Sequence, residues 1–357
     1  YLHNFLPSQP DFNFHNEDVQ NFLLGEVEFW LKKGVDGFRL DTVNYYFHDR
    51  ELRNNPKSPI PFNKPPINPY YMQNQLFAIN QDENLVFLNK FRNLLNCYPE
   101  TTSIGEIGDS HRAIKLMKEY TKDSRIHMAY SFKLLGKEFS APFFRETIKE
   151  FYNEGTDSWP CWSFSNHDVT RHLSRWDKNE SDSFAKLSCA LLLSLPGTPC
   201  LYQGEEIGQV ETELQFDELT DPPGIRFWPK NKGRDGCRTP MTWDHQKINA
   251  GFSGKTPWLP VKEKQINRSV SLQEDEPNSI LNFYKQFILF RKSNPALSAG
   301  KHIFLNEHED LLVFNREIQH LKTLCIFNLS ENAYVIDIGG LSMDSNISSN
   351  INIKDDQ

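Results

Sequence analysis

The chain has 357 residues, enough for a barrel domain of about 250 residues and a smaller second domain. Its 39 Lys and Arg residues against 47 Asp and Glu residues give a formal charge of -8, which argues against a nucleic-acid partner. No apolar run approaches the roughly 18 residues of a membrane span, because Lys, Ser or Pro interrupts each candidate. We therefore expect a soluble protein with a large core and no membrane partner.

The cysteines are scattered, without a CxxC pair and without His at metal-ligand spacing; they are Cys97, Cys161, Cys189, Cys200, Cys237 and Cys325. We expect free thiols in a reducing compartment, which favours a cytoplasmic location. The chain opens at Tyr1 rather than at an initiator Met, so we expect a fragment of a longer protein. Whether a signal peptide precedes it stays open.

Strand-like and helix-like segments alternate along the first 300 residues. Residues 16–31 carry apolar side chains at helical spacing, with Asn16 as the predicted N-cap and Gly34 just beyond the end. The strand-like segment 35–41 follows. The alternation continues with helices at 83–96, 110–120, 138–151, 182–195 and 279–291, and with strands at 102–106, 126–132, 161–164 and 199–203. Repeated units of this kind predict an α/β fold with a parallel sheet.

Five strand-helix units are visible, whereas a closed (β/α)8 TIM barrel needs eight. We therefore predict strands 4 to 8 of such a barrel in residues 16–296, with about three units before Tyr1. The alternative is a complete five-stranded doubly wound domain. The two long stretches 50–79 and 210–274 lack periodicity, and we expect the first to form a wall of the active site, because long loops after barrel strands do so.

After residue 296 the pattern changes to short alternating segments, at 311–315, 323–328 and 333–338. This pattern predicts a small, β-rich C-terminal domain over residues 297–357. Its tail from residue 342 is rich in Asn, Ser and Asp, and we expect it to fray.

Asp41 ends the first predicted strand, and Arg39 lies two residues earlier, so both side chains point to the same side of the sheet. A guanidinium beside a carboxylate favours the ionised form, which a carboxylate nucleophile requires. The alternative is a structural ion pair at a strand end.

Glu106 ends the next strand between Gly105 and Gly108, which leave room for a ligand. A partly apolar surround would raise its pKa towards that of a general acid, although a glutamate in a glycine-rich turn is a common structural feature. After the strand at 161–164, His167 and Asp168 stand side by side without further metal ligands at sensible spacing. They suit hydrogen bonding to sugar hydroxyls, with a buried structural His as the alternative.

Three segments, GFRLD at 37–41, GEIGD at 105–109 and SNHD at 165–168, resemble in order and spacing the catalytic blocks of the α-amylase family of glycoside hydrolases. Further segments resemble its oligo-1,6-glucosidase and α-glucosidase branch: QPDFN at 9–13, GTPCLYQGEEIG at 197–208 and RDGCRTPMTW at 234–243. The matches run from Tyr1 to about Pro295. In this resemblance residues 1–15 are the end of the domain B loop.

The resemblance implies a retaining, exo-acting α-glucosidase in which Asp41 is the nucleophile, Glu106 the acid/base and Asp168 a carboxylate that clamps substrate hydroxyls. The first two should stand about 5 to 5.5 Å apart. The residues expected around the terminal glucose are Arg39, His167, Arg234 and, as an aromatic wall, Phe5.

Thr42 follows the nucleophile, and in this branch Thr there resembles enzymes that prefer α-1,4 bonds, whereas Val accompanies α-1,6 activity. The alternatives are an α-1,6-preferring or transglucosylating relative, such as a trehalose synthase or sucrose isomerase, and a non-catalytic binding subunit. The implied chemistry needs no cofactor and no metal at the site. The structural Ca or Mg ion that some members of the family carry would lie in the part before Tyr1, and the protein is expected as a monomer or homodimer acting on an α-glucoside.

Overall fold

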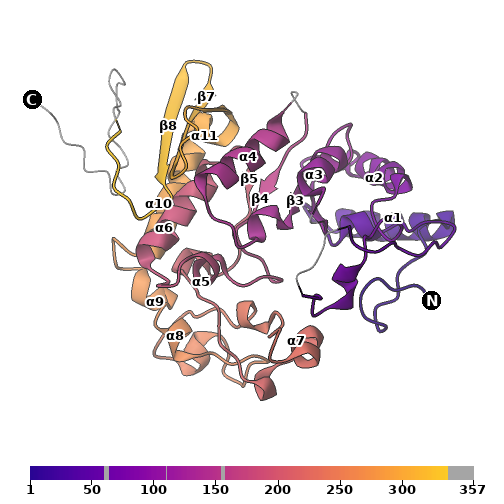
Figure 1. Ribbon diagram of the computed structural model, residues 1–357, viewed down its shortest axis with the longest axis horizontal. Coiled ribbons are helices and arrows are strands. Elements are labelled where there is room, and N and C mark those ends of the chain that lie inside the picture. The colour runs from indigo at the N-terminus through magenta and orange to yellow at the C-terminus, as the bar shows by residue number, and fades with distance from the viewer. Residues whose placement is uncertain (60–63, 110, 154–156, 337–357) are drawn as a thin grey trace, which may run out of the picture.

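The computed structural model describes residues 1–59, 64–109, 111–153 and 157–336. In Figure 1, α1 (Glu17–Lys32) and α2 (Asp82–Leu95) lie on one side of the molecule, and β7 (Leu311–Ile318) and β8 (Leu321–Asn328) lie on the opposite side. The predicted first helix is confirmed as α1, because Asn16 caps it by accepting a hydrogen bond from the Asp18 N–H at 2.9 Å. Gly34 follows its end with a φ of 90°, which suits glycine.

In the described part of the chain, five parallel strands follow one another in space in the same order as in the sequence. They are β1 (Gly37–Leu40), β2 (Thr102–Ile107), β3 (Met128–Ser131), β4 (Cys161–Trp162) and β5 (Thr198–Pro199). A parallel bridge between Ala129 and Pro160 connects β3 to β4. This strictly sequential order differs from a doubly wound sheet, in which the strand order reverses at a switch point.

Helices connect the strands, as the alternating pattern predicted. The long ones after α2 are α3 (Ala113–Thr121), α4 (Ala141–Tyr152), α6 (Asp182–Ser194) and α10 (Ile280–Ser293). Ser140, Ser181 and Ser279 cap the last three by accepting hydrogen bonds from backbone N–H groups. Ser110, the first residue of the helix predicted at 110–120, lies outside the described residues.

The insertion between β5 and α10 contains short helices that the sequence analysis assigned to a loop: α7 (Pro222–Phe227), α8 (Glu263–Ile266) and α9 (Val270–Gln273). Another short helix, α5 (His172–Trp176), follows the segment that carries Asp168. These helices span one or two turns, too short for a hydrophobic period to stand out in the sequence.

The C-terminal sheet is antiparallel and contains β6 (Lys301–Phe304), β7 and β8, preceded by α11 (Pro295–Ala299). The all-β C-terminal region is therefore confirmed, although β6 was not predicted. The strand predicted at 333–338 is wrong in its described part, since residues 333–336 form no strand; residues 337 and 338, and the tail from 342, lie outside the described residues. Alternation alone does not make a strand where no neighbouring strand accepts its hydrogen bonds.

Buried arginines join the C-terminal sheet to the preceding domain. Arg316 of β7 is 1% exposed and donates to the carbonyls of Ser194, at the end of α6, and Gly300, at 2.7 and 2.9 Å. Arg291 of α10 donates to the Gly197 carbonyl just before β5 at 2.7 Å. The apolar core continues between the two regions, with Leu191 of α6 and Phe314 of β7 in one buried cluster. These hydrogen bonds and the shared core fix the C-terminal sheet against α6, and fix α10 against the start of β5.

Candidate active site

Asp41 and Glu106 meet at the carboxyl ends of β1 and β2. The parallel register pairs Leu40 with Gly105, so the next residues, Asp41 and Glu106, stand side by side on neighbouring strands. The two carboxylates differ in exposure, since the Asp41 side chain is 69% exposed and that of Glu106 is 4% exposed. One is thus open to a ligand, and the other is enclosed by protein.

Arg39 joins the two carboxylates through the two prongs of its guanidinium. Its Nη1 donates to Asp41 Oδ1, and its Nη2 lies 3.0 Å from Glu106 Oε2. The same Nη2 donates to the Tyr130 hydroxyl at 2.8 Å, and that hydroxyl donates to Glu106 Oε1 at 3.1 Å. The predicted contact between Arg39 and Asp41 is therefore present, and the arginine also reaches the second carboxylate.

Burial raises the pKa of Glu106. The Thr42 N–H and the charge of Arg39 oppose this shift, whereas the negative charges of Asp41 and Asp168 add to it. The raised pKa favours the protonated form that a general acid needs, and the effect of Asp168 places all three carboxylates within one electrostatic environment.

Two arginines hold Asp168. Its Oδ1 accepts from Arg234 Nη1 at 2.9 Å and from Arg238 Nη2 at 3.0 Å. Arg234 is itself fixed by the fully buried carboxylate of Asp221, with Nη2 and Oδ1 2.7 Å apart. Asp168 therefore faces the site with one oxygen bound twice and its other oxygen 3.2 Å from His167 Nε2.

His167 is half-exposed beside Asp168. Burial lowers its pKa, while the Asp168 charge opposes this shift and the Arg39 and Arg238 charges favour it. A neutral imidazole can donate one hydrogen bond to a sugar hydroxyl. The charge of Asp41 also acts on this ring, so His167 lies near Asp41 as well as Asp168.

Phe5 reaches the candidate site only indirectly in the described contacts, through Tyr45. It is 48% exposed and its ring packs on Tyr45 at a centroid distance of 5.2 Å. Tyr45 donates to the carbonyl of Gly108, two residues after Glu106, at 3.3 Å. Tyr45 thus connects Phe5 to the end of β2, the strand that carries Glu106.

The sequence analysis missed Tyr130 and Arg238 as site residues. Arg238 lies in the RDGCRTPMTW segment, four residues after Arg234, so the segment itself gave a signal. Tyr130 lies on the predicted third strand, where alternation places it on the same face as residue 128, but nothing in the sequence marks its hydroxyl as a partner of Glu106.

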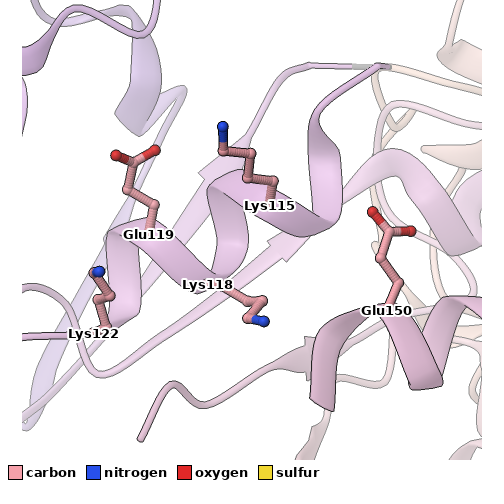
Figure 2. A pocket seen from close by; sticks show the side chains of 5 residues that line it. All are labelled: Lys115, Lys118, Glu119, Lys122 and Glu150. Atoms are coloured by element: carbon pink, nitrogen blue, oxygen red, sulfur yellow. The ribbon is translucent and has the colours of Figure 1, made fainter. Parts of the chain in front are cut away.

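A depression of about 280 Å³ lies on the outer helices rather than at the strand ends. It is lined by Lys115, Lys118 and Glu119 of α3, by Lys122 just after α3 and by Glu150 of α4. Figure 2 shows that Lys115 and Glu119 point away from Lys118, so these charges do not converge on one point. Mixed charges that do not converge make no site for a sugar.

Within the described ranges, no group of three or more His, Cys, Asp and Glu side chains is arranged to hold a metal ion. In the same part of the chain, every helix is too short or too polar to cross a membrane. All six cysteines are described and are free thiols.

Comparison with known families adds to this geometry. Residues 1–300 match the model described as "Alpha amylase, catalytic domain". The chain is 47% identical over 342 residues to a probable alpha-glucosidase of Rhizobium meliloti, and 31% identical over 381 residues to an oligo-1,6-glucosidase of Heyndrickxia coagulans. These matches include 93% and 94% of this chain, which spans 62% and 65% of the two relatives' lengths.

Solved structures give a consistent result. A crystal structure of the alpha-glucosyl transfer enzyme XgtA matches with a TM-score of 0.88 and 46% identity, over 92% of this chain and 62% of that chain. The crystal structure of an isomaltulose synthase mutant from Erwinia rhapontici NX5 matches with a TM-score of 0.76 and 27% identity. This match covers 93% of this chain and 63% of that chain.

Proposed function

Since the chain belongs to the alpha-amylase family of glycoside hydrolases, whose catalytic domain is a TIM barrel, we propose that it carries strands 4 to 8 of the barrel of a retaining α-glucosidase. The proposed substrate is a terminal, non-reducing α-1,4-linked glucose in maltose, a short oligosaccharide or an aryl α-glucoside. Its similarity to a probable alpha-glucosidase supports this proposal. We also propose a reducing, cytoplasmic location, which the six free cysteines support.

The observation that carries the proposal is that one arginine, Arg39, contacts both the exposed carboxylate of Asp41 and the buried carboxylate of Glu106. Arg39 contacts an oxygen of each, so the two carboxyl groups are neighbours with different environments. A separation of about 5 to 5.5 Å is the spacing at which one carboxylate attacks directly and the other transfers protons.

In the first step, Glu106 donates its proton to the glycosidic oxygen while Asp41 attacks the anomeric carbon. The bond to the leaving sugar breaks, and a covalent glucosyl ester forms on Asp41 through an oxocarbenium-like transition state. In the second step, Glu106 accepts a proton from water as the water oxygen attacks the same carbon. The ester bond breaks, and glucose leaves with its original α configuration.

Asp168 accepts hydrogen bonds from two adjacent hydroxyls of the terminal glucose in this proposal. Arg234 and Arg238 hold it for that purpose, and His167 donates to a further hydroxyl. Phe5 forms part of an aromatic wall. Every proton in these steps moves between a side chain and substrate or water, so the mechanism calls on no cofactor.

A second candidate is glucosyl transfer, favoured by similarity to a structure described as an alpha-glucosyl transfer enzyme. In that reaction a sugar hydroxyl replaces water in the second step, and the residues do the same chemistry. Similarity to oligo-1,6-glucosidases likewise keeps α-1,6 bonds as an alternative substrate.

The test is turnover of p-nitrophenyl α-glucoside and maltose by the full-length protein, with proton NMR of the first product. Release of α-glucose before mutarotation supports the proposal. A folded protein that leaves both substrates intact, or that releases β-glucose first, overturns it. A disaccharide isomer in place of free glucose favours the transfer reaction.

A further inference from the structure

Arg234 and Arg238 flank one tight turn, Asp235–Cys237, so the position of this turn decides where both guanidinium groups lie. The turn packs closely on the segment after β5. A Cβ atom on Gly236 would lie 2.3 Å from Glu211 Oε1, and the Gly236 carbonyl accepts from the Thr212 N–H at 3.0 Å. A small shift of the turn would therefore displace the two arginines from Asp168.

Arg171 lies where three segments of the site meet. It follows Asp168 by three residues, is 3% exposed, and donates from Nη2 to the Cys237 carbonyl in the turn at 3.0 Å. Its Nη1 donates to the Gln203 carbonyl after β5 at 2.9 Å. Its own N–H donates to Glu211 Oε2 at 2.9 Å, so one residue connects the Asp168 segment, the segment after β5 and the turn.

The surroundings of Arg171 fit a planar guanidinium group that donates hydrogen bonds in two directions. The guanidinium carbon lies 4.7 Å from the centre of the Tyr202 ring, and the Tyr202 hydroxyl donates to the same Cys237 carbonyl at 3.0 Å. Gly204, with a φ of 95°, leaves space for it, since a Cβ there would lie 2.9 Å from Arg171 Nη1. A Lys ammonium at this position could donate to the Gln203 or the Cys237 carbonyl, but it lacks the second, rigidly placed donor nitrogen that would reach the other one.

We propose that Arg171 is a positioning residue that sets Arg234 and Arg238 on Asp168 by holding the turn between them. Its guanidinium acts through the backbone carbonyls of Gln203 and Cys237 and has no hydrogen bond to the Asp168 carboxylate among the described contacts. The consequence for catalysis rests on the proposed function, whereas the effect on the two arginines does not.

The experiment replaces Arg171 with Lys in the full-length protein and compares it with Arg145→Lys. Arg145 is a matched control, since it is also 3% exposed and its guanidinium donates to two backbone carbonyls. These carbonyls belong to His308 and Leu311 near the C-terminal sheet, which contains none of the predicted site residues. We expect Arg171→Lys to lower kcat/KM on maltose about tenfold or more, the effect of losing one charge-assisted hydrogen bond, mainly through kcat. Arg145→Lys should stay within about twofold of the wild type, even if its melting temperature falls as much.

A double-mutant cycle with Arg238→Lys separates positioning from general destabilisation. The Arg171 and Arg238 losses should combine to much less than their product, because both act on the same carboxylate, whereas Arg145 and Arg238 losses should multiply. Multiplicative losses for Arg171 and Arg238, or an equal loss in Arg145→Lys, overturn the inference.

Crystal structures of the two variants test the inference even if the wild type hydrolyses no α-glucoside. The contacts of Asp168 Oδ1 with Arg234 and Arg238 should lengthen in Arg171→Lys and persist in Arg145→Lys; unchanged contacts in Arg171→Lys overturn the inference. If Arg171→Lys does not fold, Tyr202→Phe removes one donor to the Cys237 carbonyl and should displace the same turn to a smaller extent. An unmoved turn in that variant overturns the inference too.

Discussion

The backbone N–H of Thr42 donates a hydrogen bond to Glu106 Oε2 at 3.1 Å, so the residue after one carboxylate holds the other. Thr42 adopts φ 42° and ψ 47°, a left-handed conformation that costs a β-branched residue about 1 to 2 kcal/mol. The bond stabilises the ionised form of Glu106, which the first step of the proposed mechanism produces and the second step uses as the base. A strained backbone at this position is thus linked directly to the proposed acid/base, Glu106.

Exchange of Thr42 for Val should change linkage preference without removing this hydrogen bond, because the backbone N–H remains. The hydroxyl becomes a methyl group of similar size, and we expect the ratio of kcat/KM on maltose to that on isomaltose to fall by about tenfold. The measurement is competition between the two disaccharides. Thr42→Ser, which keeps the hydroxyl, serves as the control, and an unchanged ratio in Thr42→Val would show that the side chain does not select the linkage.

Glu106→Gln should lower kcat/KM on maltose by about 10² to 10⁴-fold, since it removes the proposed general acid. An aryl α-glucoside with a good leaving group should lose less in kcat/KM, because its oxygen needs little protonation. Burial raises the pKa of Glu106, so wild-type kcat/KM should decline as pH rises through that pKa, and the residual activity of the variant should lack this decline. Glu119→Gln on α3 is the control; equal losses on both substrates would contradict the acid role.

Gly236→Ala should destabilise the protein and reduce activity together. Its Cβ would lie 2.3 Å from Glu211 Oε1 and 2.7 Å from the Thr212 carbonyl, so the turn between Arg234 and Arg238 must move. We expect a loss of about 1 to 3 kcal/mol in urea unfolding, as for other overpacked sites. Gly254→Ala, where a Cβ meets nothing within 4 Å, should leave both properties unchanged. If the Gly236→Ala variant has the stability and activity of the wild type, the turn tolerates the displacement.

Glu211→Gln should stabilise the fold at alkaline pH. Burial raises the pKa of Glu211 to about 7 from its ordinary 4.5, so the folded state binds more protons between these values. This contribution to stability is fully present below about pH 4.5 and is lost as pH rises to about 7. Relative to the wild type, the variant should gain up to about 3 kcal/mol at pH 8 and little at pH 4.5.

Urea unfolding at the two pH values measures this difference, with Glu146→Gln on the exposed side of α4 as the control. The amide oxygen of Gln can still accept from the Arg171 N–H, so the contact itself is preserved. A gain of equal size at both pH values would show that burial of the charge is not its cause.

The strand-helix order was predictable because it depends on short-range signals. Helical periodicity and caps such as Asn16 are local, and these gave α1, α2, α4, α6 and α10 within a few residues. Strand lengths were less predictable, since the strand expected at 199–203 pairs only at Thr198 and Pro199, and β6 was missed. Strand ends depend on which neighbours pair with them, and that information is not local.

By itself, the sequence determined the order of the parallel strands and the position of Asp41, Glu106 and Asp168 at or just after three of them, because motifs and alternation are written in consecutive residues. Only the tertiary structure decided that Arg39 bridges two carboxylates, that Tyr130 reaches Glu106 across 24 positions, and that Arg238 reaches Asp168 across 70. Exposure was likewise decided there, leaving Asp41 open and Glu106 buried. A pKa or a second hydrogen bond depends on atoms brought together by packing, and no spacing along the chain specifies them.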